Sequence, residues 1–321
     1  MKQVEHLLGY RASIKVMDAT LRDGGLVNYF YFTDDFVKAL YKTNLEAGVD
    51  YMEMGYRASK KVFDETKFGK WKFCSDDHIR EIVGENDTDL KLAIMADIGR
   101  HDKNDFDEKV NSPVDMVRVA AYIHQMPEAI DMIEDAHKKG YETTCNIMAI
   151  SQTQESDLKV ALDMLGKTPV DTIYIVDSFG SIYPEEMKRI VDIYMEAATK
   201  YGKQLGVHAH NNQQLAFANT IEACGDGVNW LDATYKGMGR GAGNCAMELL
   251  LGFLKNPKYN TYPVFRFISD YMVKLEEDGV VWGYDLQYLM TGQLNQHPRA
   301  AIKFTKDKRK DYAEFYKDLI V

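Results

Sequence analysis

Short apolar runs rich in β-branched residues alternate along the chain with longer stretches of helical periodicity. This alternation is typical of parallel βαβ units. The runs predict eight strands, over residues 14–21, 49–55, 90–96, 114–120, 141–149, 171–177, 205–210 and 228–234. Eight strand–helix pairs in about 240 residues favour a (β/α)8 barrel over an open sheet, which usually has five or six strands.

The intervening helices are marked by capping residues and by glycines. Thr33 opens a helix through Ala47 that Gly48 ends, and Ser75 caps the next one. Helices are predicted over residues 34–47, 76–83, 127–139, 155–165, 184–200, 214–224 and 244–255. A helix between the third and fourth strands, within residues 99–112, is only weakly indicated.

The predicted domain organisation is one barrel with an appendage. Residues 13–258 form the catalytic (β/α)8 TIM barrel, an α/β fold. Residues 259–321 follow as a C-terminal helical extension, rich in aromatic residues and without signs of a separate core.

Composition excludes several classes of protein. There are 39 Lys and Arg against 49 Asp and Glu, a net charge of −10, which disfavours nucleic-acid binding. The four cysteines are far apart, so no zinc knuckle or disulfide framework is expected. No apolar run approaches the roughly 20 residues of a membrane span, and the charged residues within 1–10 do not suit a signal peptide. We expect a cytoplasmic protein with no membrane association.

Candidate chemistry lies where strands end, because barrel enzymes place their active sites at the C-terminal ends of the strands. His208 and His210 share one face of the seventh strand and can converge on one ion. Asp23, at the end of the first strand, can reach the same point when the barrel closes. A His-x-His pair alone is equally well explained by two hydrogen-bonded surface histidines, and the nearby acid favours the metal.

Two imidazoles and one carboxylate suit a divalent ion. The residues do not choose among Mn2+, Mg2+, Co2+ and Zn2+, of which we expect Mn2+ or Mg2+ first. Asn244 could be a weaker oxygen ligand, could orient a histidine, or could cap the helix predicted after it. Asn244 ends a glycine-rich turn, residues 237–244. The backbone N–H groups of this turn could bind an anion, or the turn could lie beside the metal.

Arg22 stands next to Asp23 and places a permanent cation beside the predicted metal. It could neutralise an enolate or a substrate carboxylate, with Glu53 of the second strand orienting it. Taken alone, such a pair is more often a structural ion pair. Both roles are compatible with one contact.

These residues together resemble the DRE-TIM metallolyase superfamily. The resemblance spans roughly residues 13–255 and is carried by the segments Thr20-Leu21-Arg22-Asp23-Gly24, Glu53, His208-Ala209-His210-Asn211 and Gly241-Ala242-Gly243-Asn244 with Glu248. It implies that Asp23, His208 and His210 bind the metal, that Asn244 is an occasional further ligand, and that Arg22 stabilises an enolate oxygen. The glycine turn is most similar to that of the 4-hydroxy-2-oxovalerate aldolase branch.

The chain departs from that branch at its catalytic base. The branch has a histidine three residues after the metal-binding aspartate, where this chain has Leu26. The branch also uses a C-terminal tyrosine, for which Tyr288 is our first candidate and Tyr284 the second. Aromatic packing over the barrel is the alternative for this segment.

The sequence thus predicts a divalent-metal-dependent carbon–carbon lyase that acts on a 4-hydroxy-2-oxoacid through a pyruvate enolate. One alternative is a Claisen-type condensation of an acyl-CoA with a 2-oxoacid. The other is a non-catalytic metal-binding barrel, suggested by Leu26. We expect a small 2-oxoacid substrate, a homo-oligomer, and a dehydrogenase as a conceivable partner.

Overall fold

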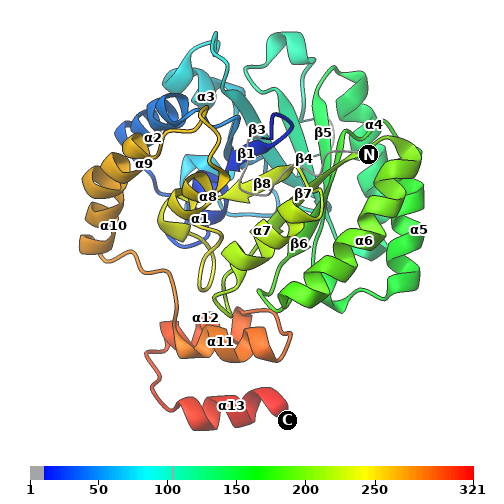
Figure 1. Cartoon of the computed structure of the whole chain (residues 1–321). Helices are drawn as coiled ribbons and strands as arrows, with labels where there is room; N and C mark the ends of the chain where they lie inside the picture. Colours follow the sequence, from blue (N-terminus) through cyan, green and yellow to red (C-terminus); the bar gives the residue numbers. More distant parts are fainter. Residues whose placement is uncertain (1–10, 103–104) are drawn as a thin grey trace.

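The structure is a computed structural model that describes residues 11–102 and 105–321. Eight parallel strands form a closed barrel in sequence order (Figure 1). They are β1 (Lys15–Asp18), β2 (Tyr51–Tyr56), β3 (Lys91–Asp97), β4 (Met116–Ala121), β5 (Glu142–Ile147), β6 (Thr172–Asp177), β7 (Gln204–Ala209) and β8 (Trp230–Ala233). Pairing of β1 with β8 closes the barrel, which confirms the predicted (β/α)8 fold.

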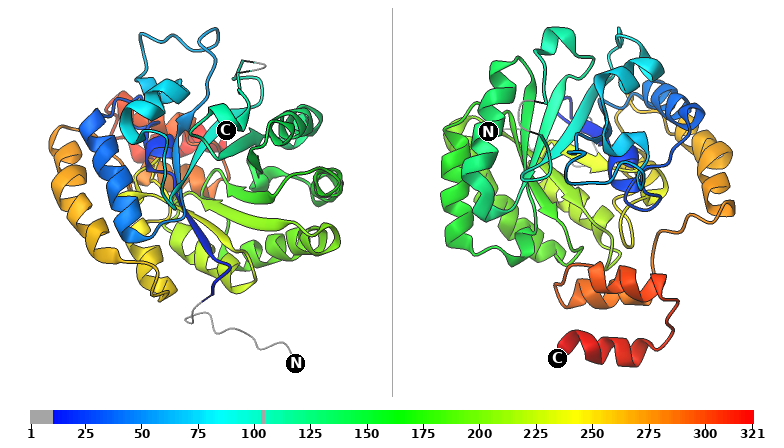
Figure 2. Two further views of the ribbon diagram at one scale, coloured as in Figure 1. Left: turned by 90° about the horizontal axis from the view of Figure 1, so that it is seen from above. Right: turned by 180° about the vertical axis from the view of Figure 1, so that it is seen from behind.

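The barrel helices surround the strands, as the view from above shows (Figure 2). They are α2 (Asp34–Ala47), α3 (Asp76–Val83), α4 (Met126–Lys138), α5 (Glu155–Gly166), α6 (Pro184–Tyr201), α7 (Ala216–Gly225) and α8 (Met247–Leu254). The predicted caps are present. Thr33 and Ser75 accept hydrogen bonds from the backbone N–H groups of Phe36 and His78, and Gly48 ends α2 with a φ of 74°.

The first strand is shorter than predicted. It ends at Asp18, whose Oδ1 accepts the backbone N–H of Thr20 at 2.9 Å and its hydroxyl. This local hydrogen bonding turns the chain into the short helix α1 (Thr20–Gly24). Arg22 and Asp23 therefore belong to a helical turn, not to the strand.

Two other predicted elements also differ. In the described part of residues 99–112 there is no α-helix, only a 3-10 turn at Lys109–Asn111. The helix after β8 begins at Met247, with Ala246 at its N-cap. Asn244 therefore does not cap this helix. It pairs instead with His210 in an isolated bridge.

The C-terminal segment has two parts. α9 (Thr261–Phe267), a π-helical turn (Ile268–Met272) and α10 (Val273–Glu277) pack along α2, with the Phe36 and Phe267 rings 5.2 Å apart. α11 (Leu286–Gln293), α12 (Arg299–Lys306) and α13 (Tyr312–Ile320) stand apart from the ring of barrel helices (Figure 2). Their buried residues Ala301, Phe304 and Phe315 form a small core, so the expectation of no separate core was wrong. The domain boundary at residue 258 stays a prediction.

The helices α11 and α12 lie beside the C-terminal mouth of the barrel (Figure 1). The hydroxyl of Ser151, after β5, donates to Asn295 between these two helices at 2.7 Å. Gly292 of α11 packs against the side chains of Asn212 and Gln213, after β7. The mouth is thus partly covered by the extension. No helix of the described residues is long and apolar enough to cross a membrane.

Candidate metal centre and active site

Asp23, His208 and His210 meet at the mouth of the barrel. Asp23 lies in α1, His208 in β7, and His210 directly after β7. All three are buried, and one potential ligand atom of each lies within 4.8 Å of the others. The two imidazole rings are nearly perpendicular, with centroids 5.1 Å apart. The three side chains that the sequence suggested as ligands are therefore close enough to share one ion.

Several buried atoms of the site lack hydrogen-bond partners among the described residues, and Nε2 of His208 and Oδ1 of Asn244 are two of them. His208 Nδ1 lies 3.0 Å from Asp232 Oδ2, a contact that keeps the ring proton on Nδ1 and leaves the lone pair of Nε2 free. A buried polar atom without a partner costs about 1–3 kcal/mol. Imidazole, carboxylate and amide donors together fit a divalent cation.

An unbroken chain of ion pairs joins the ligands across the barrel. Arg22 donates to Asp23 Oδ1 through Nη1 and to Glu53 Oε2 through Nε, both at 2.8 Å. Arg118 of β4 donates to the same Glu53 oxygen at 2.8 Å and to Asp232 Oδ2 at 2.7 Å. Because Asp232 also holds His208, this chain fixes a ligand at each of its ends.

Ionisation within the site favours cation binding. Burial alone would raise the pKa of Asp23, but attraction to the guanidinium of Arg22 holds this pKa well below its usual range. Burial lowers the pKa of His210 far below its ordinary value, so the ring is neutral. Burial would also lower the pKa of Arg22, but Glu53 outweighs it and raises this pKa. The result is a carboxylate, a neutral imidazole and a guanidinium side by side.

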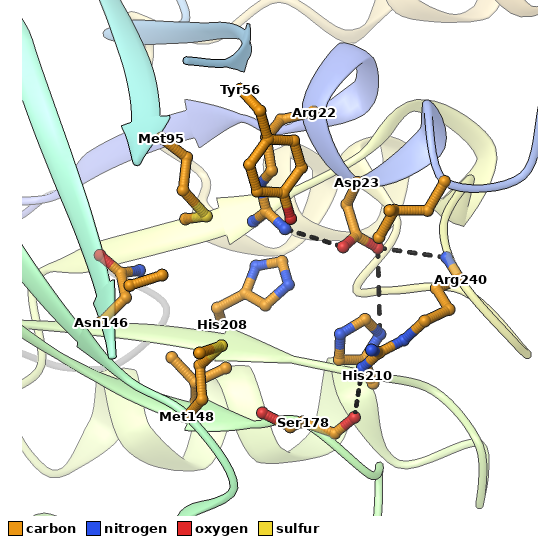
Figure 3. A pocket seen from close by; sticks show the side chains of 13 residues that line it. Arg22, Asp23, Tyr56, Met95, Asn146, Met148, Ser178, His208, His210 and Arg240 are labelled. Atoms are coloured by element: carbon orange, nitrogen blue, oxygen red, sulfur yellow. Dashed lines mark hydrogen bonds and ion pairs between the residues drawn. The ribbon is translucent and has the colours of Figure 1, made fainter. Parts of the chain in front are cut away.

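A cavity of about 420 Å³, including its open mouth, adjoins these groups (Figure 3). Its polar wall holds Arg22 and Asp23 on one side and His208 and His210 on another. The remaining lining residues are Leu26, Tyr56, Met95, Ala120, Asn146, Met148, Val176, Ser178 and Arg240. A lining that combines charged, polar and apolar groups suits a small oxoacid.

The glycine-rich turn after β8 supports Asp23. Asp23 Oδ2 accepts the side-chain N–H of Asn244 at 2.7 Å and the backbone N–H of Arg240 at 3.2 Å. Gly239 lies so close that a Cβ there would be 2.4 Å from Asp23 Oδ2. The turn therefore needs a glycine at this position.

The structure separates the other candidates. Glu53 is fully buried between the two arginines. Tyr288 lies on α11, half-buried, with its ring beside Gly241, and it is not among the residues that line the cavity. Tyr284 is 54% exposed. A proton-transfer role for Tyr288 stays a prediction.

Sequence reasoning missed several residues of the site, chiefly Arg118, Asp232, Tyr56 and Arg240. Arg118 and Asp232 carried a usable signal, since each is a charged residue inside an otherwise apolar strand. Arg240 carried no separate signal, since it stands among the glycines of the turn.

Comparisons with known proteins agree with this geometry. The HMGL-like family model matches residues 13–266. An oxaloacetate decarboxylase of Mycobacterium tuberculosis is 28% identical over 241 residues, which are 75% of this chain and 69% of that protein. A 4-hydroxy-2-oxovalerate aldolase of Thermus thermophilus is 29% identical over 247 residues, 76% of this chain and 70% of the relative.

A solved structure is similar over most of the chain. It is the N-terminal domain of a protein from Bacteroides vulgatus described as an aldolase, with a TM-score of 0.77 and 30% identity. The match covers 91% of this chain and 97% of that domain.

Proposed function

The chain belongs to the HMGL-like family and is an enzyme of the lyase type, and from this premise we propose that it breaks the C3–C4 bond of a small 2-oxoacid and releases pyruvate through its enolate. The observation that carries the proposal is the unpartnered Nε2 of His208 beside Asp23 and His210. A buried imidazole nitrogen without a partner, next to a carboxylate and a second imidazole, is costly until a ligand such as a metal ion binds there.

Asp23, His208 and His210 would hold the divalent ion, with Asn244 as a further oxygen donor. Mn2+ or Mg2+ is our first expectation, and Co2+ or Zn2+ the alternative. When bound, the ion supplies a Lewis acid for the 2-oxo group. Arg22 adds a fixed positive charge at the cavity, and its Nη2 makes no hydrogen bond with other described residues, so it remains available for the developing oxyanion.

The first candidate reaction is aldol cleavage of a 4-hydroxy-2-oxoacid. A base removes the 4-hydroxyl proton, the C3–C4 electron pair passes to C3, and an aldehyde leaves. Protonation at C3 then gives pyruvate. Relatives named 4-hydroxy-2-oxovalerate aldolase support this candidate.

The second candidate is decarboxylation of an oxaloacetate-like acid. Here the C4 carboxylate leaves as CO2 and its electron pair passes to C3, so no base is needed. Leu26 favours this reaction, because it lines the cavity at the position where the resemblance places the base. The Mycobacterium tuberculosis relative supports it as well.

Exchange of the pyruvate methyl protons tests both candidates at once, since both pass through the pyruvate enolate. Protein loaded with Mn2+ is mixed with pyruvate in deuterated water, and loss of the methyl signal is followed by NMR. We expect exchange in the wild type, and its loss together with bound metal in Asp23→Asn and His208→Ala. Absence of wild-type exchange would overturn the proposal and favour a non-catalytic barrel.

Product analysis then separates the reactions. Aldehyde release from 4-hydroxy-2-oxovalerate indicates the aldolase, and CO2 release from oxaloacetate the decarboxylase. Release of free thiol from acetyl-CoA with a 2-oxoacid would instead indicate the condensing reaction. A dehydrogenase partner is meaningful only if an aldehyde is formed.

A further inference from the structure

Arg240 is a cavity residue that the proposed chemistry does not use. Its backbone N–H donates to Asp23, but its side chain runs past His210 toward the opposite wall (Figure 3). There Nη2 donates to the backbone carbonyl of Ser178 at 2.8 Å. The guanidinium thus lies away from Arg22, across the cavity from α1.

The Arg240 side chain forms no direct ion pair with a described carboxylate, although Asp23 attracts it at longer range. Arg22 and Arg118 each form ion pairs with two acids. For Arg240, by contrast, no carboxylate of the described residues lies within ion-pair distance, and its side-chain partners are the Ser178 carbonyl and the His297 ring. Its Nε is buried and has no hydrogen-bond partner in the described structure. Such an arginine keeps both charge and donors for an anion.

His297, just before α12, places an imidazole ring against the Arg240 guanidinium. The backbone N–H of Arg299 lies 3.1 Å from Nδ1 of His297 and 2.8 Å from the His297 carbonyl oxygen, so this contact does not decide which ring nitrogen carries the proton. Nε2 faces Nη1 of Arg240 at 3.2 Å. Burial and the charge of Arg240 lower the pKa of His297 to about 4, which keeps the ring neutral. A neutral ring therefore offers Arg240 no charge that balances its own, whichever nitrogen carries the proton.

An oxyanion placed beside Arg240 would accept from its unpartnered Nε and form the ion pair that the guanidinium lacks. We propose that Arg240, positioned by His297 and by the Ser178 carbonyl, binds an anionic group at the far end of the substrate, so that the enzyme acts on 2-oxoacids that end in a carboxylate or a phosphate. The inference rests on the proposed function, because the 2-oxoacid end must occupy the side of Asp23, His208 and His210. It narrows the substrate class to acids with a charged terminus in place of a methyl group.

Matched unreactive ligands test the proposal whatever bond is broken. 2-Oxoglutarate and 2-oxovalerate differ by a terminal carboxylate in place of a methyl group, and each can compete with pyruvate in the proton exchange. Calorimetry with the Mn2+-loaded protein measures their binding independently of turnover. We expect 2-oxoglutarate to bind at least tenfold more tightly, and a phosphate-ended 2-oxoacid shows which oxyanion is preferred.

Substitutions then assign the effect to the two residues. In Arg240→Met the ratio of the two affinities should fall to about one, in Arg240→Lys it should fall only in part, and in His297→Phe it should fall several-fold. Lys303→Met removes an exposed charge on α12 and should keep the wild-type ratio within twofold. Bound metal and the unfolding temperature show that each variant is folded.

A wild-type ratio near one, or an unchanged ratio in Arg240→Met, would overturn the inference. If the wild type binds 2-oxoglutarate preferentially but does not exchange pyruvate protons, the proposed lyase function fails while the anion site stands. If it exchanges protons without preference, the function stands and the anion site fails.

Discussion

At the scale of single residues, the site depends on buried charges that each contact a charge of opposite sign. Asp23, Arg22, Glu53, Arg118 and Asp232 alternate in sign, and each touches the next. Removing one member of a buried ion pair typically costs about 3–5 kcal/mol, because its partner is left uncompensated. Substitutions within this chain of ion pairs should therefore destabilise the protein, although only one of its members, Asp23, is a candidate metal ligand.

Lys72 offers a residue-scale prediction outside this chain. It is 5% exposed, and its Nζ lies 4.2 Å from the ring centres of both Tyr56 and Phe63. Burial lowers the pKa of Lys72 from 10.5 to about 8. Between these values the unfolded chain binds more protons than the folded one, so stability contributed by this group rises with pH. Relative to Lys72→Met, the wild type should gain about 2–3 kcal/mol between pH 7 and 10.

Urea unfolding at several pH values measures this difference. Ionisation of tyrosines and cysteines affects both proteins equally and cancels in the comparison. Lys38→Met, at an exposed position of α2, is the matched control. The difference in free energy of unfolding between the wild type and this variant should not change with pH. A parallel pH dependence of Lys72→Met and the wild type would contradict the prediction.

The residues that the sequence revealed are those with local signals. His208 and His210 are two positions apart on one strand, and Arg22 and Asp23 are neighbours. Arg118 could not be joined to Glu53 and Asp232 in the same way, because 65 and 114 positions separate it from them. Such contacts depend on the barrel's register, which strand patterns alone do not specify.

At the scale of elements, the turn after β8 decides the position of Asp23. A Cβ on Gly239 would be 2.1 Å from Asn244 Nδ2, so a side chain there must displace either the amide or the carboxylate. We expect Gly239→Ala to weaken metal binding at least tenfold, measured by titration with Mn2+. Gly252→Ala is the control, because a Cβ there meets nothing within 4 Å in α8. Equal affinities in the two variants would contradict the role of the turn.

The predicted boundaries of two elements were wrong, because a polar side chain there makes a hydrogen bond that the apolar pattern does not show. The apolar run through residue 21 predicted a longer first strand, but Asp18 captures the N–H of Thr20 and starts α1. The helix after β8 was placed too early because Asn244 is a good helix cap in isolation. In the folded chain its amide instead bonds Asp23, 221 positions away.

At the scale of the whole molecule, closure of the barrel creates the site. Pairing of β1 with β8 brings α1 beside the turn that carries Arg240 and Asn244, and pairing of β7 with β8 adds the histidines. The extension then reaches the same mouth through His297. Residues that span nearly the entire described chain thus meet at one cavity, and metal binding should be linked to global stability.

A ligand that binds only the folded chain stabilises it by about 2.7 kcal/mol at one hundred times its dissociation constant. For a domain of this size, that predicts a rise of about 4–8 °C in unfolding temperature with saturating Mn2+, reversed by a chelator and measured by calorimetry. The net charge of −10 provides other places for cations, so the wild type alone does not locate the effect. In Asp23→Asn the rise should vanish, whereas Gly252→Ala should keep it. A rise in unfolding temperature that persists in Asp23→Asn would place the stabilising ion outside the barrel mouth. This conclusion would hold for calcium or magnesium as well as for Mn2+.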